Sequence, residues 1–108
     1  MFDAQMKRGL IEKCVLSLLC RGDSYGYQII KDLSCYVEIS ESTLYPILRR
    51  LEADECLIEY SVEFSGRLRK FYRITEKGRR VLTEFAADWP QMVKINDFIQ
   101  EGLSYEQK

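Results

Sequence analysis

The segment from Ile39 to Glu52 constrains the fold most, because its apolar residues recur at helical spacing. At about 100° per residue these residues fall on one face of a helix; they are Leu44, Ile47, Leu48 and Leu51. Ser40 is a suitable N-cap, and Glu41 follows in the first turn, where the helix dipole favours an acidic side chain. The segment therefore predicts a short helix with one face in a core.

The other side of this helix carries Ser42, Thr43, Tyr45, Pro46, Arg49 and Arg50. Hydroxyl groups near a helix N-terminus, together with an aromatic hydroxyl and two arginines, suit contact with a DNA groove. A solvated amphipathic helix explains the same segment equally well. Pro46 removes the hydrogen bond to the Ser42 carbonyl, which predicts a bend.

A β-hairpin is predicted directly downstream. Residues 57–63 and 69–74 are rich in aromatic and β-branched side chains, and the loop 64–68 between them contains Gly66. A helix that leads into a hairpin with arginines at its tip indicates a winged helix-turn-helix arrangement, in the α+β class. We predict this domain over residues 1–75 and a long C-terminal dimerisation helix over 76–108, packed as one compact unit.

The charges of the chain are unevenly distributed. The formal net charge is −1 and the pI is about 5.5, yet seven of the basic residues lie between positions 67 and 80 with only Glu76 against them. These are Arg67, Arg69, Lys70, Arg73, Lys77, Arg79 and Arg80. Local concentration of positive charge matters more than the total for phosphate contact. The run favours DNA contact over a merely soluble surface.

Three segments in this order resemble the PadR-type transcriptional regulators. They are Tyr25-Gly26-Tyr27-Gln28-Ile29-Ile30, Ser40-Glu41-Ser42-Thr43-Leu44-Tyr45-Pro46 with Arg50-Leu51-Glu52, and Arg69-Lys70-Phe71-Tyr72-Arg73-Ile74-Thr75-Glu76-Lys77-Gly78. The resemblance extends from about Leu10 to about Ile99. Its single long C-terminal helix makes the chain similar to the small subfamily. The resemblance implies a homodimer in which this helix packs with the first helix of the other subunit.

The predicted DNA-contacting residues come from three elements. They are Tyr25, Gln28 and Lys31 in a second helix from Tyr25 to about Tyr36, then Ser40, Ser42, Thr43, Tyr45, Arg49 and Arg50, and finally Arg67, Arg69 and Lys70 in the wing. Asp23 or Ser24 is predicted to cap the second helix. We expect a repressor that binds a palindromic DNA operator as a homodimer. The acidic pI favours an alternative, a winged-helix protein-interaction module without DNA binding.

The remaining composition excludes other classes. Leu10 to Leu19 predict a first helix of about ten residues, too short to cross a membrane, and residues 1–8 have no secretory signal organisation, so we expect a cytoplasmic protein. The chain has no histidine and its four cysteines form no C-x-x-C pair, so we expect no metal or cofactor and no enzyme activity. Reduced, partly buried thiols are expected, with redox sensing as the alternative.

The last helix carries an apolar stripe. Thr75 is the predicted N-cap, and positions three and four apart hold Leu82, Phe85, Trp89, Met92, Asn96, Ile99 and Leu103. A chain of 108 residues has little else to cover so long a stripe, which predicts a homodimer. The predicted interface consists of Leu10, Leu82, Phe85, Trp89, Met92, Asn96 and Ile99. Pro90 is expected to kink or divide the helix.

Trp89 is the only tryptophan, and two hypotheses apply to it. It is either interface core or a ligand-binding residue. In some small PadR-like regulators that sense drugs, a tryptophan at this place lines a pore between the subunits. The resemblance therefore implies a planar aromatic effector that stacks on Trp89.

Overall fold

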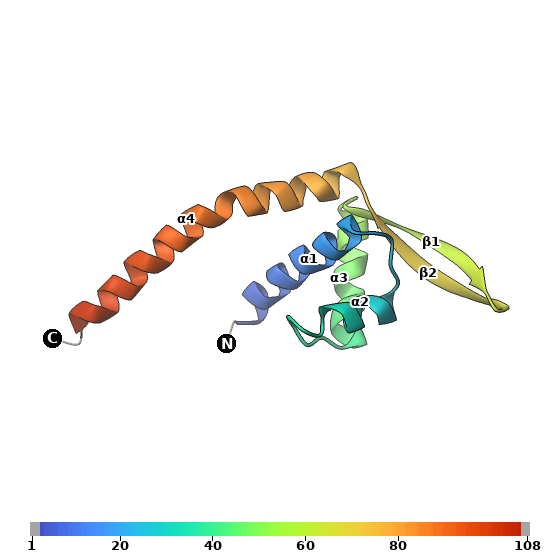
Figure 1. Cartoon of the computed structure of the whole chain (residues 1–108), viewed down its shortest axis with the longest axis horizontal. Coiled ribbons are helices and arrows are strands. Elements are labelled where there is room, and N and C mark those ends of the chain that lie inside the picture. Colours follow the sequence, from blue (N-terminus) through green and yellow to red (C-terminus); the bar gives the residue numbers. More distant parts are fainter. Residues whose placement is uncertain (1–2, 107–108) are drawn as a thin grey trace.

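The computed structural model describes residues 3–106, which form a three-helix core, a hairpin wing and a projecting helix (Figure 1). In chain order the elements are α1 (Ala4–Cys20), α2 (Gly26–Leu33), α3 (Glu41–Ala53), β1 (Leu57–Phe64), β2 (Arg67–Ile74) and α4 (Glu76–Glu106). This is the predicted α+β winged helix-turn-helix fold with a long C-terminal helix.

The core lies between α1, α2, α3 and the base of the hairpin. The four apolar residues predicted for the inner face of α3 are all buried, with Leu44 at 0% exposure. They pack with Val15 and Leu16 of α1 and with Ile29 of α2. The sequence pattern of this helix therefore placed its inner face correctly, and α3 continues through Pro46 as one helix.

The first two helices differ from prediction in length. Helix α1 has 17 residues instead of about ten, because Asp3 caps it: the Met6 amide donates to Asp3 Oδ1 over 2.8 Å. Most of its first turns lie outside the core, so no apolar stripe marked them. Helix α2 ends at Leu33 rather than near Tyr36, and its N-cap position is held by Tyr25, not by Asp23 or Ser24.

The hairpin turn is tighter than predicted. Strands β1 and β2 are antiparallel, with Leu57 opposite Ile74 at the base and Phe64 opposite Arg67 at the tip. Only Ser65 and Gly66 connect them, with φ values of 51° and 79°. Positive φ at both central residues is typical of two-residue hairpin turns. The predicted five-residue loop was too long by three residues, because positions 64, 67 and 68 belong to the strands.

Helix α4 starts at the base of the hairpin. As predicted, Thr75 caps it, and its Oγ1 accepts from the Gly78 amide over 3.1 Å. Gly78 lies so close to the hairpin that an added Cβ would collide with the Cys56 carbonyl oxygen and approach Ile74 Cγ1 to 2.7 Å. This close contact requires glycine and fixes where α4 leaves the wing.

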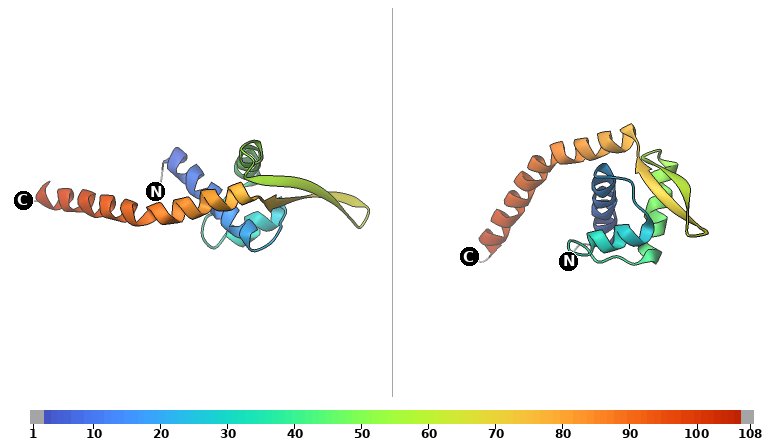
Figure 2. Two further views of the ribbon diagram at one scale, coloured as in Figure 1. Left: turned by 90° about the horizontal axis from the view of Figure 1, so that it is seen from above. Right: turned by 45° about the vertical axis from the view of Figure 1, so that its right-hand side comes forward.

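Pro90 was expected either to kink α4 or to divide it, and the helix is not divided, because it continues through Pro90. The helix instead curves along its length (Figure 1). Its far end projects away from the core in every view, which gives the molecule a long axis of 67 Å (Figure 2). Within residues 3–106, no helix is both long and apolar enough to cross a membrane.

Candidate nucleic-acid interface

The N-terminus of α3 presents a group of exposed hydroxyls. Ser40 occupies the N-cap position, but its Oγ pairs with Ser42 Oγ over 2.9 Å and with Thr43 Oγ1 over 3.3 Å instead of with a backbone amide. The first amides of a helix have no carbonyl partner within it, and they attract phosphate. Three hydroxyls and a helix N-terminus thus face solvent together.

A groove runs between α3 and the wing. One cavity of about 560 Å³ is lined by Tyr25, Gly26, Tyr27, Tyr45, Leu68, Arg69, Lys70 and Tyr72. A second cavity of about 210 Å³ shares Tyr45, Lys70 and Tyr72 with it and adds Leu48, Arg49, Glu52 and Glu59. The structure therefore brings together five of the predicted DNA-contacting residues, from the start of α2, from α3 and from the wing: Tyr25, Tyr45, Arg49, Arg69 and Lys70.

Gly26 explains how Tyr45 reaches this groove. A Cβ at position 26 would collide with the Tyr45 hydroxyl and lie 2.9 Å from its Cζ. The absence of a side chain on Gly26 therefore lets the ring of Tyr45 pack directly against the first turn of α2. A glycine inside a helix is unfavourable by roughly 1 kcal/mol relative to alanine, and here it makes room for this ring.

Arg49 and Arg50 are neighbours with different surroundings. Arg49 is exposed and lines the groove. Arg50 Nη1 instead donates to Glu12 Oε1 over 2.7 Å, which joins α3 to α1, and the Glu12 side chain is only 16% exposed. Arg50 is thus engaged in holding two core helices together, and we leave it out of the proposed interface.

The cations of the wing are engaged to different degrees. The Lys70 Nζ lies 3.7 Å from Glu59 Oε1 in an exposed pair. The guanidinium of Arg69 lies 4.4 Å from the ring centroid of Tyr25 and 5.4 Å from that of Phe64. Arg67, beside the turn, is exposed, and its side chain has no hydrogen-bond or ion-pair partner among the described residues.

The basic run does not form one patch. Lys77, Arg79 and Arg80 belong to α4, which starts at the base of the hairpin, at the opposite end from the Ser65–Gly66 turn (Figure 1). On α2, Gln28 Nε2 donates to Asp32 Oδ1 over 2.8 Å, and Lys31 is exposed. The basic residues that line the groove are Arg49, Arg69 and Lys70.

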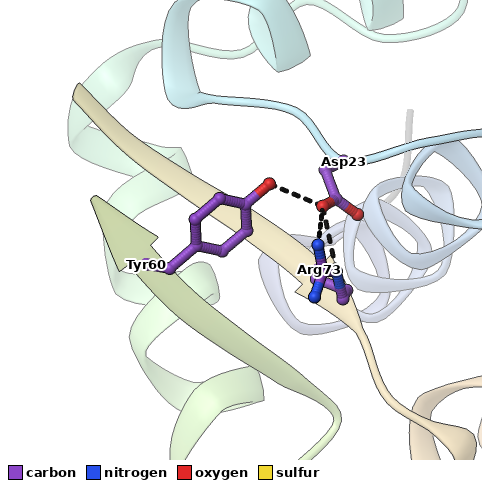
Figure 3. Close-up of polar contacts among 3 residues, drawn as sticks. All are labelled: Asp23, Tyr60 and Arg73. Atoms are coloured by element: carbon purple, nitrogen blue, oxygen red, sulfur yellow. Dashed lines mark hydrogen bonds and ion pairs between the residues drawn. The ribbon is translucent and has the colours of Figure 1, made fainter. Parts of the chain in front are cut away.

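One polar network was not found from the sequence. Tyr60 Oη donates to Asp23 Oδ2 over 2.5 Å, and Arg73 donates to the same oxygen from Nε over 2.9 Å (Figure 3). The Tyr60 hydrogen bond and then that of Arg73 lower the pKa of the Asp23 carboxyl below its ordinary value. Arg73 was counted among the free positive charges, but it is paired here. Tyr60 and Arg73 are 37 and 50 positions away from Asp23 in the sequence, so no local spacing predicts this network.

The apolar stripe of α4 has two parts. Leu82 packs against the core of its own chain. The ring of Phe85 lies 5.3 Å from Lys13 Nζ of α1 and 5.7 Å from the Trp89 ring. The far part is exposed, with Trp89 at 44%, Met92 at 41% and Ile99 at 54%. Leu10 is half-buried on α1, and Asn96 is exposed. Within the described part of the chain, nothing covers the stripe beyond Trp89.

The fold and the groove define a winged helix-turn-helix protein. The family model for PadR-like transcriptional regulators matches residues 15–84, and the chain belongs to this family of transcriptional regulators. The chain is 35% identical over 81 residues to Transcriptional regulator Rv3488 of Mycobacterium tuberculosis, covering 74% of this chain and 76% of that protein.

Solved structures agree with this assignment. A PadR family transcriptional regulator from Eggerthella lenta DSM 2243 superposes with a TM-score of 0.81 at 36% identity, covering 90% of this chain and 87% of that one. PadR of Bacillus subtilis, solved in complex with operator DNA, shares the fold with a TM-score of 0.65 at 22% identity. That match covers 71% of this chain and 45% of the Bacillus chain.

Proposed function

We propose that this transcriptional regulator acts as a cytoplasmic repressor that binds a palindromic DNA operator as a homodimer. The observation that carries the proposal is the groove between α3 and the wing, where Tyr45, Arg49 and Lys70 line one continuous surface. The hydroxyls of Ser40, Ser42 and Thr43 extend this surface at the N-terminus of α3. The Bacillus relative bound to operator DNA supports the same use of the fold.

Helix α3, helix α2 and the wing each make a different kind of contact with the DNA. Helix α3 enters the major groove with its N-terminal hydroxyls, Tyr45 and Arg49 towards the DNA, while Gln28 and Lys31 of α2 contact the backbone. The wing contributes Arg67, Arg69 and Lys70 to phosphates or to the adjacent minor groove. Two such units related by a two-fold axis read two half-sites, so the operator is palindromic. Repression follows when the dimer occupies a promoter.

Replacing Arg49 with alanine tests the proposal. The DNA is a duplex enriched by the wild-type protein from a random-sequence pool. If Arg49 contacts a base, we expect Arg49→Ala to weaken the binding free energy by about 1–3 kcal/mol. If it contacts a phosphate, we expect the salt slope, the dependence of log binding constant on log salt concentration, to be lower by about one. The melting temperature should change little, because Arg49 is exposed.

Arg50→Ala is the matched control. It removes the same charge one residue away, but it breaks the ion pair with Glu12. We expect a lower melting temperature with an unchanged salt slope of DNA binding. The reverse pattern, in which Arg49→Ala melts far lower yet binds DNA normally, would show that the assignment of the two faces is wrong.

We further propose that a planar aromatic effector stacks on Trp89 between the α4 helices of the two subunits. The half-exposed indole beside Phe85 supports this site. Because Trp89 is the only tryptophan, its fluorescence reports on the site directly. Compounds that bind should quench the emission and release the duplex. Unchanged emission across a panel of planar aromatic compounds would contradict an effector site at Trp89.

A further inference from the structure

The turn between α1 and α2 fastens to the wing through three consecutive residues. Ser24 pairs with Tyr72 of β2 as an antiparallel bridge: the Tyr72 amide donates to the Ser24 carbonyl over 2.8 Å, and the Ser24 amide donates back over 3.2 Å. The turn thus adds a short third strand beside β2.

The side chains on either side of Ser24 extend this contact. In an extended segment alternate side chains point to the same face. Ser24 is buried, whereas Asp23 and Tyr25 both contact the hairpin. Asp23 accepts from Tyr60 of β1 and from Arg73 of β2, so one carboxylate oxygen joins both strands (Figure 3). The Tyr25 ring packs on Phe71, with 5.3 Å between centroids.

The rest of the wing has little other support. Every residue from 61 to 70 is exposed, and the buried side chains of the hairpin lie near its base. A two-stranded hairpin is marginally stable by itself in water. Its turn begins roughly 17 Å beyond Tyr60 at about 3.3 Å per residue, so a small tilt at the base moves the tip by several ångströms.

From this geometry we propose that Asp23 is a positioning residue for DNA binding, whose carboxylate holds the wing at the angle to α3 that the operator requires. The proposal rests on the proposed function, in which α3 and the wing contact one duplex together. Holding the wing in place before binding lowers the ordering cost of the complex. The benefit is largest for the operator, where both elements must be in register at once.

The direction in which DNA affinity changes when the Asp23 charge is removed distinguishes a positioning role from a purely electrostatic one. Asp23 places a negative charge near the wing and neutralises Arg73. By charge alone, its removal should strengthen binding to every DNA, because phosphates are negative and Arg73 becomes free. Positioning instead predicts weaker binding to the operator, with binding to unrelated DNA unchanged or stronger.

The experiment compares Asp23→Asn with the wild-type full chain on two duplexes. One is enriched by the wild-type protein from a random-sequence pool, and the other is a scrambled duplex of equal length and composition. We expect operator affinity to fall roughly tenfold, the scale of coupling within one hydrogen-bonded network, and affinity for the scrambled duplex to hold or rise. Glu63→Gln removes the same charge from the wing itself, at an exposed residue, and should not weaken either complex.

Tyr60→Phe provides a second, milder variant. It removes the hydroxyl but keeps the stacking of ring 60 on Phe71, so the chain should stay folded even if Asp23→Asn does not. We expect it to weaken operator binding in the same way, and the double variant to lose less than the sum of the two. Hydrogen exchange should be faster for amides 60–72 in Asp23→Asn, with exchange in α1 unchanged.

Operator binding by Asp23→Asn or Tyr60→Phe at wild-type strength or above would overturn the proposal. So would an equal loss on both duplexes, because a positioning role is specific to the operator. If the wild-type protein enriches no sequence, the proposed function fails instead. The exchange of the wing amides then still decides whether Asp23 holds the wing.

Discussion

Tyr72 of strand β2 contacts both the turn between α1 and α2 and the groove beside α3. Its backbone bonds to Ser24, and its side chain is 4% exposed, at the groove that also contains Tyr45 and Arg49. Burial raises the pKa of the Tyr72 hydroxyl to about 12, with the nearby Glu59 carboxylate adding to the shift. The protonated phenol is therefore the form that fits the folded chain.

This shift predicts how stability depends on alkaline pH. Between pH 10 and about 12 the unfolded chain loses the Tyr72 proton while the folded chain keeps it, so the free energy of unfolding falls as pH rises. Below pH 10 the group contributes no pH dependence. Urea unfolding across this range should show a steeper decline for the wild type than for Tyr72→Phe. Parallel declines would contradict the assignment to Tyr72.

Single residues also show where sequence reasoning reaches its limit. Helical periodicity placed both Arg49 and Arg50 off the apolar face, and it could not tell them apart. Their difference depends on Glu12, which lies 38 residues away and approaches only when α1 packs on α3. The network around Asp23 also depends on partners that are distant in the sequence and meet only in the folded chain. Spacing along the chain encodes which side of a helix a residue occupies, but not which distant partner meets it there.

At the scale of elements, the wing consists of an anchored base and a solvated tip. Its strands could be recognised by composition, since aromatic and β-branched residues flank a glycine. The ends of the turn were predicted less accurately than the strands. Phe64 and Leu68, at the tip, are 61% and 77% exposed, so the strands have no alternation of buried and exposed residues there that would mark where they end. For helix α4, a kink or a division was predicted at Pro90; the helix is not divided there, and it curves along its length (Figure 1).

The wing should supply affinity without sequence preference. Replacing Arg67 and Lys70 with alanine removes two positive charges from strand β2 of the wing, and each lost phosphate contact lowers the salt slope by about 0.9. We expect binding to the enriched duplex and to scrambled DNA to weaken together, as measured by titration at several salt concentrations.

A double variant in α4 serves as the control for the wing. Lys77→Ala with Arg79→Ala removes the same charge beyond the base of the hairpin, away from the tip. It should leave the salt slope close to that of the wild type. A loss confined to the enriched duplex in the wing variant would instead place base recognition in the wing.

At the scale of the whole molecule, the main feature is an apolar face of α4 that no other part of residues 3–106 covers. The first part of the α4 stripe packs on α1 of its own chain, which the heptad spacing alone did not show. Beyond it, Trp89, Met92, Ile99 and Leu103 are all 41% or more exposed. Apolar patches rimmed by polar residues are typical of association surfaces, and a second copy brings an identical face. The exposed part of the stripe therefore supports the proposed homodimer.

Truncating this face should dissociate the dimer. Burial contributes roughly 25 cal/mol per Å² of apolar surface, and in a symmetric pair each substitution counts twice. We expect Met92→Ala with Ile99→Ala to sediment as a monomer at concentrations where the wild type is a dimer. Phe98→Ala is the control: Phe98 is next to Ile99 and 76% exposed, but it lies off the stripe, so the dimer should persist.

The monomeric variant should also lose operator binding although its groove is intact, because one half-site contact is weak without the second. Wild-type protein that sediments as a monomer at micromolar concentration would contradict the dimer.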